Sequence, residues 1–250
     1  MSRIAFGLTV LLICVPSAHA DLVLDDFSTP IAGLTASGAG STNDLTDNPA
    51  NVVGGIRDAR VTVLASSAGF PTPTGTLLIN SANVPPFADF QSNSSADAIF
   101  ALEYDGTSGF NAGPNPSAGL NLNVAGATGF SFSYITSSNF TVTISVVDST
   151  GTTTDSGTFN LGGVPVLTNA FLPIASLAGG GTIFNNSNIG GFRLTFAGAR
   201  DFDITIANGI ILTVPANGGD AIPEPGTLAL ASVLGAVGIG LGLARRRRAA

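Results

Sequence analysis

Several residue types that folded chains commonly use are rare or absent in this sequence. Its 250 residues include no lysine, no tryptophan, one methionine, one cysteine and one histidine. Cys14 and His19 both lie in the first twenty residues, so a chain that loses this leader keeps neither a thiol nor an imidazole. Disulfides, His/Cys zinc sites and Ser-His-Asp or Cys-His catalysis are then excluded. Because only carboxylates, arginines, tyrosines and hydroxyls remain for chemistry, we expect a protein that is not an enzyme.

Positive charge is also scarce. Between residues 21 and 222, 15 acidic residues stand against four arginines, which gives a formal net charge of −11. Nucleic-acid binding depends on cationic contacts with phosphate, so nucleic acid is not an expected partner. Strong acidity of this kind favours solubility and a weak attraction for cations.

The first twenty residues have the pattern of a secretory signal peptide. Arg3 is followed by an apolar run over residues 4–15, and Ala18 and Ala20 place small residues where signal peptidase cleaves. We expect residues 1–20 to be removed, which leaves a mature chain that starts at Asp21. Lipidation at Cys14 is a less favoured alternative, because the preceding residue is isoleucine rather than a small one.

The other end of the chain has the pattern of a membrane anchor with a neck. Residues 226–244 carry no charge, and as a helix they would extend about 28 Å, close to the thickness of the hydrocarbon core. Pro223 and Pro225 cannot continue that helix, so Glu224 is expected to be extended and exposed. The basic tail 245–250 should stay cytoplasmic; its charged residues are Arg245, Arg246, Arg247 and Arg248.

This order of features resembles a PEP-CTERM sorting signal over residues 222–250. The motif lies in 222–225, with Pro223, Glu224 and Pro225 as substrate residues, and is followed by the span and the basic tail. The resemblance implies export across the inner membrane of a Gram-negative-type bacterium that makes exopolysaccharide. It also implies recognition and cleavage by exosortase, after transient insertion in the inner membrane, with the product at the cell surface or outside the cell. A permanently anchored single-pass protein is the alternative.

Residues 21–221 predict an all-β domain. Phe130, Phe132 and Tyr134 alternate with serines, and a second alternating run over 140–146 follows a Ser-Ser-Asn turn, a pattern typical of a meander with one buried face. We expect loops at 31–51, 66–74 and 106–116, and further strands at 60–66, 76–80, 97–104, 119–124, 156–161, 191–198, 201–208 and 209–214. Strands of this number and length predict one antiparallel β-sandwich of the jelly-roll-like kind, large enough to bury a core without disulfides.

A second resemblance concerns the domain itself. It opens with LVLDDFS at 22–28 and ends with ARDFDITIANGIIL at 199–212, an order similar to jelly-roll domains of the galactose-binding and carbohydrate-binding-module type. The resemblance implies that the first and last strands are adjacent, often beside a structural calcium. Calcium is therefore a possible cofactor, with carboxylate ligands drawn from Asp25, Asp26, Asp201 and Asp203. The segment 206–209 departs from the pattern, because it lacks an acidic pair.

Two hypotheses for the domain follow, and Tyr104 discriminates between them. Tyr104 lies between Glu103 and Asp105 and is the aromatic residue that we expect to be free to stack on a sugar ring. If it is exposed, a carbohydrate-binding surface module is favoured. If it is packed inside, a structural protein of the biofilm or exopolysaccharide envelope is favoured. Glu103 and Asp105 are spaced like a glycosidase pair, about 7 Å apart on one strand face, but any strand offers that spacing.

Overall fold

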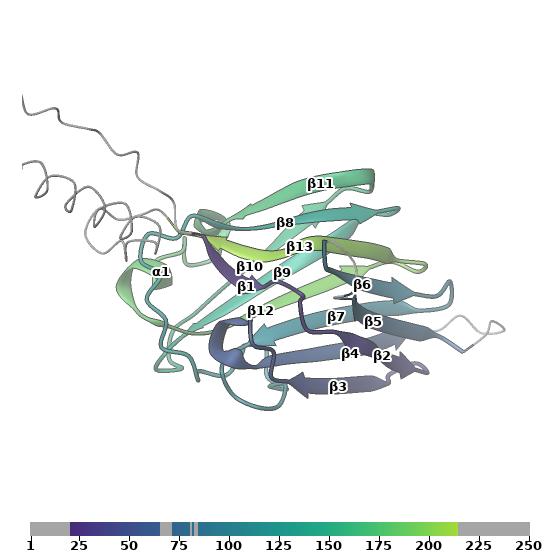
Figure 1. The fold of residues 1–250 in the computed structure, drawn as a ribbon, viewed down its shortest axis with the longest axis horizontal. Helices are drawn as coiled ribbons and strands as arrows, with labels where there is room; N and C mark the ends of the chain where they lie inside the picture. Colours follow the sequence, from purple (N-terminus) through teal and green to yellow (C-terminus); the bar gives the residue numbers. More distant parts are fainter. Residues whose placement is uncertain (1–20, 66–71, 81, 83–84, 215–250) are drawn as a thin grey trace, which may run out of the picture. The chain divides into compact units, whose positions relative to one another are not determined.

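The computed structural model describes residues 21–214, apart from 66–71, 81 and 83–84, and these residues form a sandwich of two antiparallel sheets (Figure 1). Sheet A has seven strands, in the order β11 (Val164–Pro173), β8 (Gly129–Thr136), β13 (Asp203–Thr213), β6 (Phe87–Ser92), β5 (Thr74–Asn80) and β2 (Ile31–Ser37), with β1 (Leu22–Asp25) paired to β13. Sheet B has six, in the order β10 (Thr154–Leu161), β9 (Phe140–Asp148), β12 (Ile189–Gly198), β7 (Asp97–Tyr104), β4 (Arg57–Ala65) and β3 (Thr42–Asp47). The prediction of an all-β antiparallel sandwich is confirmed.

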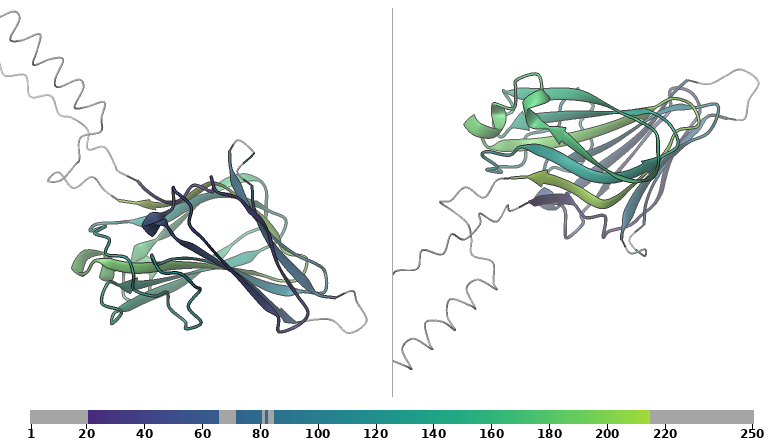
Figure 2. Two further views of the ribbon diagram at one scale, coloured as in Figure 1. Left: turned by 60° about the horizontal axis from the view of Figure 1, so that its bottom comes forward. Right: turned by 90° about the horizontal axis from the view of Figure 1, so that it is seen from above.

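Three short helical turns complete the described elements. They are η1 (Val53–Gly55), η2 (Ile174–Ser176) and α1 (Ile183–Asn186). The chain changes sheets repeatedly, for example between β2 and β3, β4 and β5, and β6 and β7, as in jelly-roll connections. Figure 2 shows the two layers from two further directions.

Phenylalanine rings fill the space between the sheets. Phe90 of sheet A stacks on Phe196 of sheet B with ring centroids 4.9 Å apart, and Phe130 meets Phe192 edge to face at 5.9 Å. All four rings are fully buried. Edge-to-face and offset contacts between rings add to the stabilisation that burial alone provides. Among the described residues the core lies mainly between the two sheets, and the helical turns η2 and α1 add Ile174, Ile183 and Phe184 to it.

The predicted meander over 129–148 is wrong in one respect. β8 and β9 both follow the expected alternation, with their aromatic and aliphatic side chains inward. They do not pair, however, because β8 lies in sheet A and β9 in sheet B. The connection turns the corner of the sandwich, where the Thr136 hydroxyl donates to the carbonyl oxygen of Asp203 at 2.6 Å. The alternating pattern suggested that β8 and β9 contribute to one buried face. Their inward faces instead belong to different sheets and meet across the core.

One predicted loop and one predicted strand also differ in the structure. The expected loop 31–51 contains β2 and β3. In β2 a register shift between Ile31 and Leu34, with Gly33 at φ 118, interrupts the period of two, and β3 is an edge strand with no buried residue. Residues 119–124, expected as a strand, make only an isolated bridge between Leu122 and Ile189. The expected loop 106–116 is confirmed.

The two ends of the described chain lie side by side. β1 and β13 are antiparallel, with Leu22 opposite Leu212, so the adjacency of first and last strands is confirmed (Figure 1). The signal peptide 1–20, the motif 222–225, the span 226–244 and the tail 245–250 lie outside the described residues. Within 21–214, no helix is long and apolar enough to cross a membrane.

Candidate functional site

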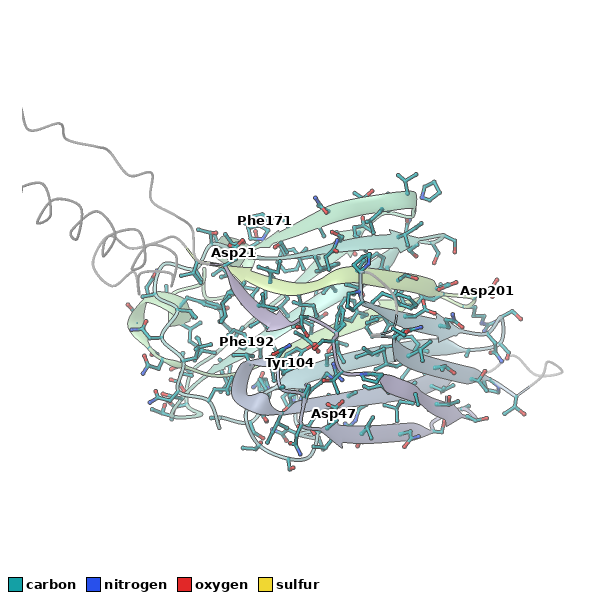
Figure 3. The ribbon with its side chains drawn as sticks, viewed as in Figure 1. Asp21, Asp47, Tyr104, Phe171, Phe192 and Asp201 are labelled. Carbon is teal, nitrogen blue, oxygen red and sulfur yellow. The ribbon has the colours of Figure 1, made fainter. Side chains whose placement is uncertain are left out.

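Tyr104 is not available to a ligand. Its side chain points from β7 into the sandwich, its exposed fraction is 0%, and its hydroxyl donates to Oδ2 of Asp25 at 3.1 Å. Burial, together with the Asp25 carboxylate, raises the pKa of Tyr104 well above its usual value. The expectation of an exposed ring is therefore wrong, and by the criterion stated above this residue favours the structural hypothesis (Figure 3).

A buried arginine occupies the oxygen-rich space around Asp25. The guanidinium of Arg57 donates to both Asp25 oxygens, at 3.2 and 2.9 Å, to the Asp47 carboxylate at 3.2 and 2.6 Å, and to the carbonyl oxygen of Thr29 at 2.9 Å. Burial raises the pKa of Asp25, while the charge of Arg57 opposes that rise. A calcium ion placed here would meet the positive charge of Arg57. The arginine therefore supplies the cation that this group of oxygens needs.

The four carboxylates expected to bind calcium are not brought together. Asp25 lies opposite Ile210, whereas Asp203 lies opposite Gln91, about 24 Å away along β13 at 3.4 Å per residue. The antiparallel pairing brings β1 to the end of β13, while Asp201 and Asp203 stand at its beginning; Figure 3 shows Asp201 far from Asp21. Asp26 faces outward and accepts a hydrogen bond from Ser28. Among the described residues, no group of three or more His, Cys, Asp or Glu side chains is placed to hold a metal.

Glu103 of β7 and Asp105, which directly follows this strand, lie on the outer side of sheet B, where a loop over residues 106–118 covers them. Arg193 of β12 donates to Oε2 of Glu103 through Nε at 2.9 Å and through Nη2 at 2.6 Å. The same guanidinium donates to three carbonyl oxygens of the loop, those of Asn111, Gly113 and Asn115. The amide of Ser117 lies between Oε1 of Glu103 and Oδ2 of Asp105. These two carboxyl groups therefore hold the loop against sheet B and do not line an open cleft.

Desolvation dominates the electrostatics beneath this loop. Burial raises the pKa of Glu103 to about 7, with Asp105 adding to the rise and Arg193 opposing it. Asp58, opposite Glu103 on β4, is also fully buried, and burial raises its pKa. Its Oδ1 accepts from Thr46 and from the amide of Gly109, while its Oδ2 has no partner among the described residues. The outer face of sheet B thus carries a buried, partly compensated acidic row.

The surface of the described domain includes the following two hollows. One, of about 580 Å³, is lined by the β8–β9 corner and the ends of β10 and β12, including Asn139, Thr141 and Asn160. The other, of about 440 Å³, lies between the covering loop and the β9–β10 turn, and its lining includes Asn111 and Asn115. Neither lining contains a titratable side chain or an exposed aromatic ring.

The outer face of sheet A does carry an exposed ring. Phe171 on β11 points away from the core with an exposed fraction of 54%. A Cβ placed on Gly129 would come within 2.3 and 2.4 Å of two Phe171 ring atoms, so the ring leans over the space that this glycine leaves free. One side of the ring is supported by the sheet and the rest faces solvent. An aromatic ring held in this way is a surface on which the apolar face of a sugar can stack.

The neighbours of Phe171 on this face are uncharged. Register places Phe171 beside Ser131, Ser131 beside Ile211, and Ile211 beside Val23 of β1. The next row holds Asn169, Ser133, Ala207 and Phe87, with Asn208 bulging from β13 nearby. We call these nine residues the Phe171 face: Val23, Phe87, Ser131, Ser133, Asn169, Phe171, Ala207, Asn208 and Ile211. The face combines amide, hydroxyl and apolar groups.

Sequence reasoning missed Phe171 for a definable reason. Leu167, Asn169 and Phe171 alternate with Thr168, Ala170 and Leu172, and a period of two shows that two faces differ without showing which one is buried. The structure buries Ala170 and Leu172. A polar residue at 169, on the same face as Phe171, is the signal in the sequence that the phenylalanine faces outward.

No protein-family model matches the chain, and no curated protein matches it. Among solved structures, the chain is similar to a family 11 carbohydrate-binding module of a cellulosomal cellulase of Clostridium thermocellum, with 12% identity and a TM-score of 0.42 over 79% of this chain and 96% of the other. It is also similar to a family 29 carbohydrate-binding module, with 13% identity and a TM-score of 0.33 over 66% and 95%. An agarase matches with 12% identity and a TM-score of 0.38 over 62% and 25%. Likenesses this weak carry no argument about function.

Proposed function

We propose that this protein is an exported carbohydrate-binding surface module, with the Phe171 face as its binding surface. The observation that carries the proposal is the ring of Phe171, half exposed and supported from below at Gly129. Stacking on such a ring removes apolar surface from water on both partners, and the ring is already held in place before the ligand arrives. The amides of Asn169 and Asn208 and the hydroxyls of Ser131 and Ser133 surround it with hydrogen-bonding groups suited to sugar hydroxyls.

Binding by residues 21–221 to immobilised polysaccharides tests this proposal, since the core of the domain lies within 21–214. Phe171→Ala should weaken retention, whereas Leu64→Ala should leave it unchanged. Leu64 is a matched control because it is exposed to a similar extent, 56%, but lies on sheet B. Equal retention of the wild type and both variants would remove Phe171 from the site. Absence of retention on every polysaccharide would favour the structural role in the biofilm or exopolysaccharide envelope.

The route to the surface is the second part of the proposal. The motif at 223–225, the uncharged span 226–244 and the four arginines 245–248 support transient insertion in the inner membrane, cleavage by exosortase, and a final place at the cell surface or outside the cell. Mass spectrometry of the C-terminal peptide, from cells and from medium, tests this. A mature chain that ends near the motif supports sorting. An intact span and tail in membranes, with nothing released, would instead make the protein a permanent single-pass anchor.

A further inference from the structure

The positively charged side chains of the domain bear on the class of polysaccharide that it can bind. Residues 21–214 contain no lysine, and each of their four arginines forms an ion pair with a carboxylate. Arg57 is buried between Asp25 and Asp47, and Arg193 is nearly buried against Glu103. The remaining pairs are Arg60 with Asp44 at 2.6 Å and Arg200 with Asp97 at 3.8 Å.

Besides their ion pairs, Arg60 and Arg193 both contact the ring of Phe110. Their guanidinium carbons lie 4.2 and 4.5 Å from the centre of the Phe110 ring. Contacts of this kind hold a cation against an aromatic face and make it less free to bind another anion. Each arginine among the described residues therefore has an acidic partner; the pair of Arg200 with Asp97 is the longest, at 3.8 Å, and Arg200 is not among the residues of the Phe171 face.

The Phe171 face itself carries no charge of either sign. Charged positions adjoin it: Asp89 lies one row further along β6, in register with Thr205, exposed Asp21 precedes β1, and Asp25 ends β1 with its side chain buried. An anionic polysaccharide that approached this face would meet the negative field of the domain without a compensating contact from an arginine. An uncharged chain has no such cost, since its recognition depends on stacking and on neutral hydrogen bonds.

Two amides on the face still have hydrogen-bonding groups to offer. The Ser133 hydroxyl donates to Oδ1 of Asn169 at 2.7 Å and accepts from Nδ2 of Asn208 at 3.4 Å. The other amide atoms of these residues, Nδ2 of Asn169 and Oδ1 of Asn208, make no hydrogen bond within the described domain. The serine therefore orients both amides and leaves one donor and one acceptor free for a ligand with many hydroxyl groups.

A second aromatic ring, that of Phe87, lies at the other side of the Phe171 face. Phe87 on β6 is half-buried, faces the same side as Asn169, and lies three strands from β11 in the order β11-β8-β13-β6. At about 4.8 Å per strand, this separation is about 14 Å. A ligand that covers both Phe171 and Phe87 must therefore be an oligosaccharide or a polymer rather than a single sugar.

We propose that the Phe171 face binds an uncharged polysaccharide chain that runs across the strands from β11 to β6 and excludes polyuronates. This inference rests on the proposed function. It assigns Phe171 and Phe87 as two separated stacking positions, with Asn169 and Asn208 as the hydrogen-bonding groups between them.

Retention of residues 21–221 on a panel of polymers tests the inference. The panel pairs a neutral glucan, a neutral galactan and a neutral mannan with polygalacturonate, alginate and the polycation chitosan, each at low and at high salt. We expect retention by at least one neutral polymer at both salt levels and none by the polyuronates. Retention on a polyuronate, lost at high salt, would overturn the ligand class while leaving carbohydrate binding in place. Binding to chitosan alone that is lost at high salt would count against both the ligand class and the carbohydrate-binding function. No binding to any polymer would also count against both.

Variants separate the two stacking positions. Phe87→Ala should weaken binding of a long neutral oligosaccharide by about 3- to 10-fold and leave a disaccharide unaffected, because only the longer chain reaches β6. Phe171→Ala should weaken both, and Leu64→Ala should weaken neither. An equal loss for long and short ligands in Phe87→Ala, with an unchanged unfolding temperature, would show that the chain does not run across the strands.

Discussion

The carboxyl group of Glu103 makes the stability of this domain depend on pH, and the size of that dependence follows from the structure. Burial raises its pKa from 4.5 to about 7. A carboxyl group whose pKa is raised on folding binds its proton more tightly in the folded state than in the unfolded state. Its contribution to the free energy of unfolding is therefore fully present below pH 4.5 and is lost as the pH rises through 7. A shift of this size corresponds to about 3 kcal/mol in full, and about 2–3 kcal/mol of it falls between about pH 5 and pH 8.5. We expect Glu103→Gln, which resembles the protonated acid, to remove that part of the pH dependence.

Urea unfolding of residues 21–221 between about pH 5 and pH 8.5 measures the effect. The wild type should lose about 2–3 kcal/mol more than Glu103→Gln across this range. In thermal unfolding the same difference is about 4–12 °C at neutral to alkaline pH. Burial also raises the pKa values of Asp25, Asp58 and Asp203. Because both proteins contain these residues, their contribution to the pH dependence is removed when the free energies of unfolding of the two proteins are subtracted.

Asp105→Asn provides an internal check of the cause. The Asp105 carboxylate adds to the rise in the pKa of Glu103, so its removal should move the midpoint of the pH dependence to lower pH. The reasoning is refuted if the stability difference between wild type and Glu103→Gln is constant over the whole range. It is refuted equally if Glu103→Gln becomes less stable than wild type as pH rises, since Arg193 would then dominate over desolvation.

The remaining predictions concern the buried cation and the support of the ring. Arg57→Ala leaves the carboxylates of Asp25 and Asp47 without their cation and should destabilise the domain by about 3–5 kcal/mol in urea unfolding, and an unchanged midpoint would contradict this. EDTA should leave the unfolding temperature of the wild type unchanged, because Arg57 supplies the positive charge; a fall in that temperature would indicate a metal. Gly129→Ala should weaken polysaccharide binding while Phe171 is still present, since the added methyl group occupies the space of its ring; full binding with a native circular dichroism spectrum would argue against the supported ring.

The alternating segments of the chain allowed the class of fold to be predicted, and the exceptions have physical causes. Phe130, Phe132 and Tyr134 point inward as expected, because aromatic residues alternating with serine have one buried face. β3 was missed because an exposed edge strand needs no apolar residues; it is held by backbone pairing and by the contact between Asp44 and Arg60. Patterns of hydrophobicity report burial, so they cannot reveal a strand that buries nothing.

The site was harder to predict than the fold. The charges of Glu103 and Asp105 suggested that Tyr104 is exposed, but β7 is a central strand with both faces covered, one by the core and the other by the loop 106–118. Those charges are paired beneath the loop, mainly through Arg193, which lies 90 residues away in sequence from Glu103. Phe171 was missed because the alternation in β11 shows that its two faces differ without showing which one is buried, and the structure leaves the face of Phe171 open.

The affinity of residues 21–221 for a neutral polysaccharide, compared between wild type, Phe171→Ala and Leu64→Ala, tests the central claim most directly. Covering the exposed half of a phenylalanine ring contributes about 1–1.5 kcal/mol, so Phe171→Ala should weaken binding by about 5- to 12-fold. Leu64→Ala should bind like the wild type. Equal affinities for all three proteins, or a loss in Leu64→Ala as large as that in Phe171→Ala, would contradict the assignment of the Phe171 face as the binding surface.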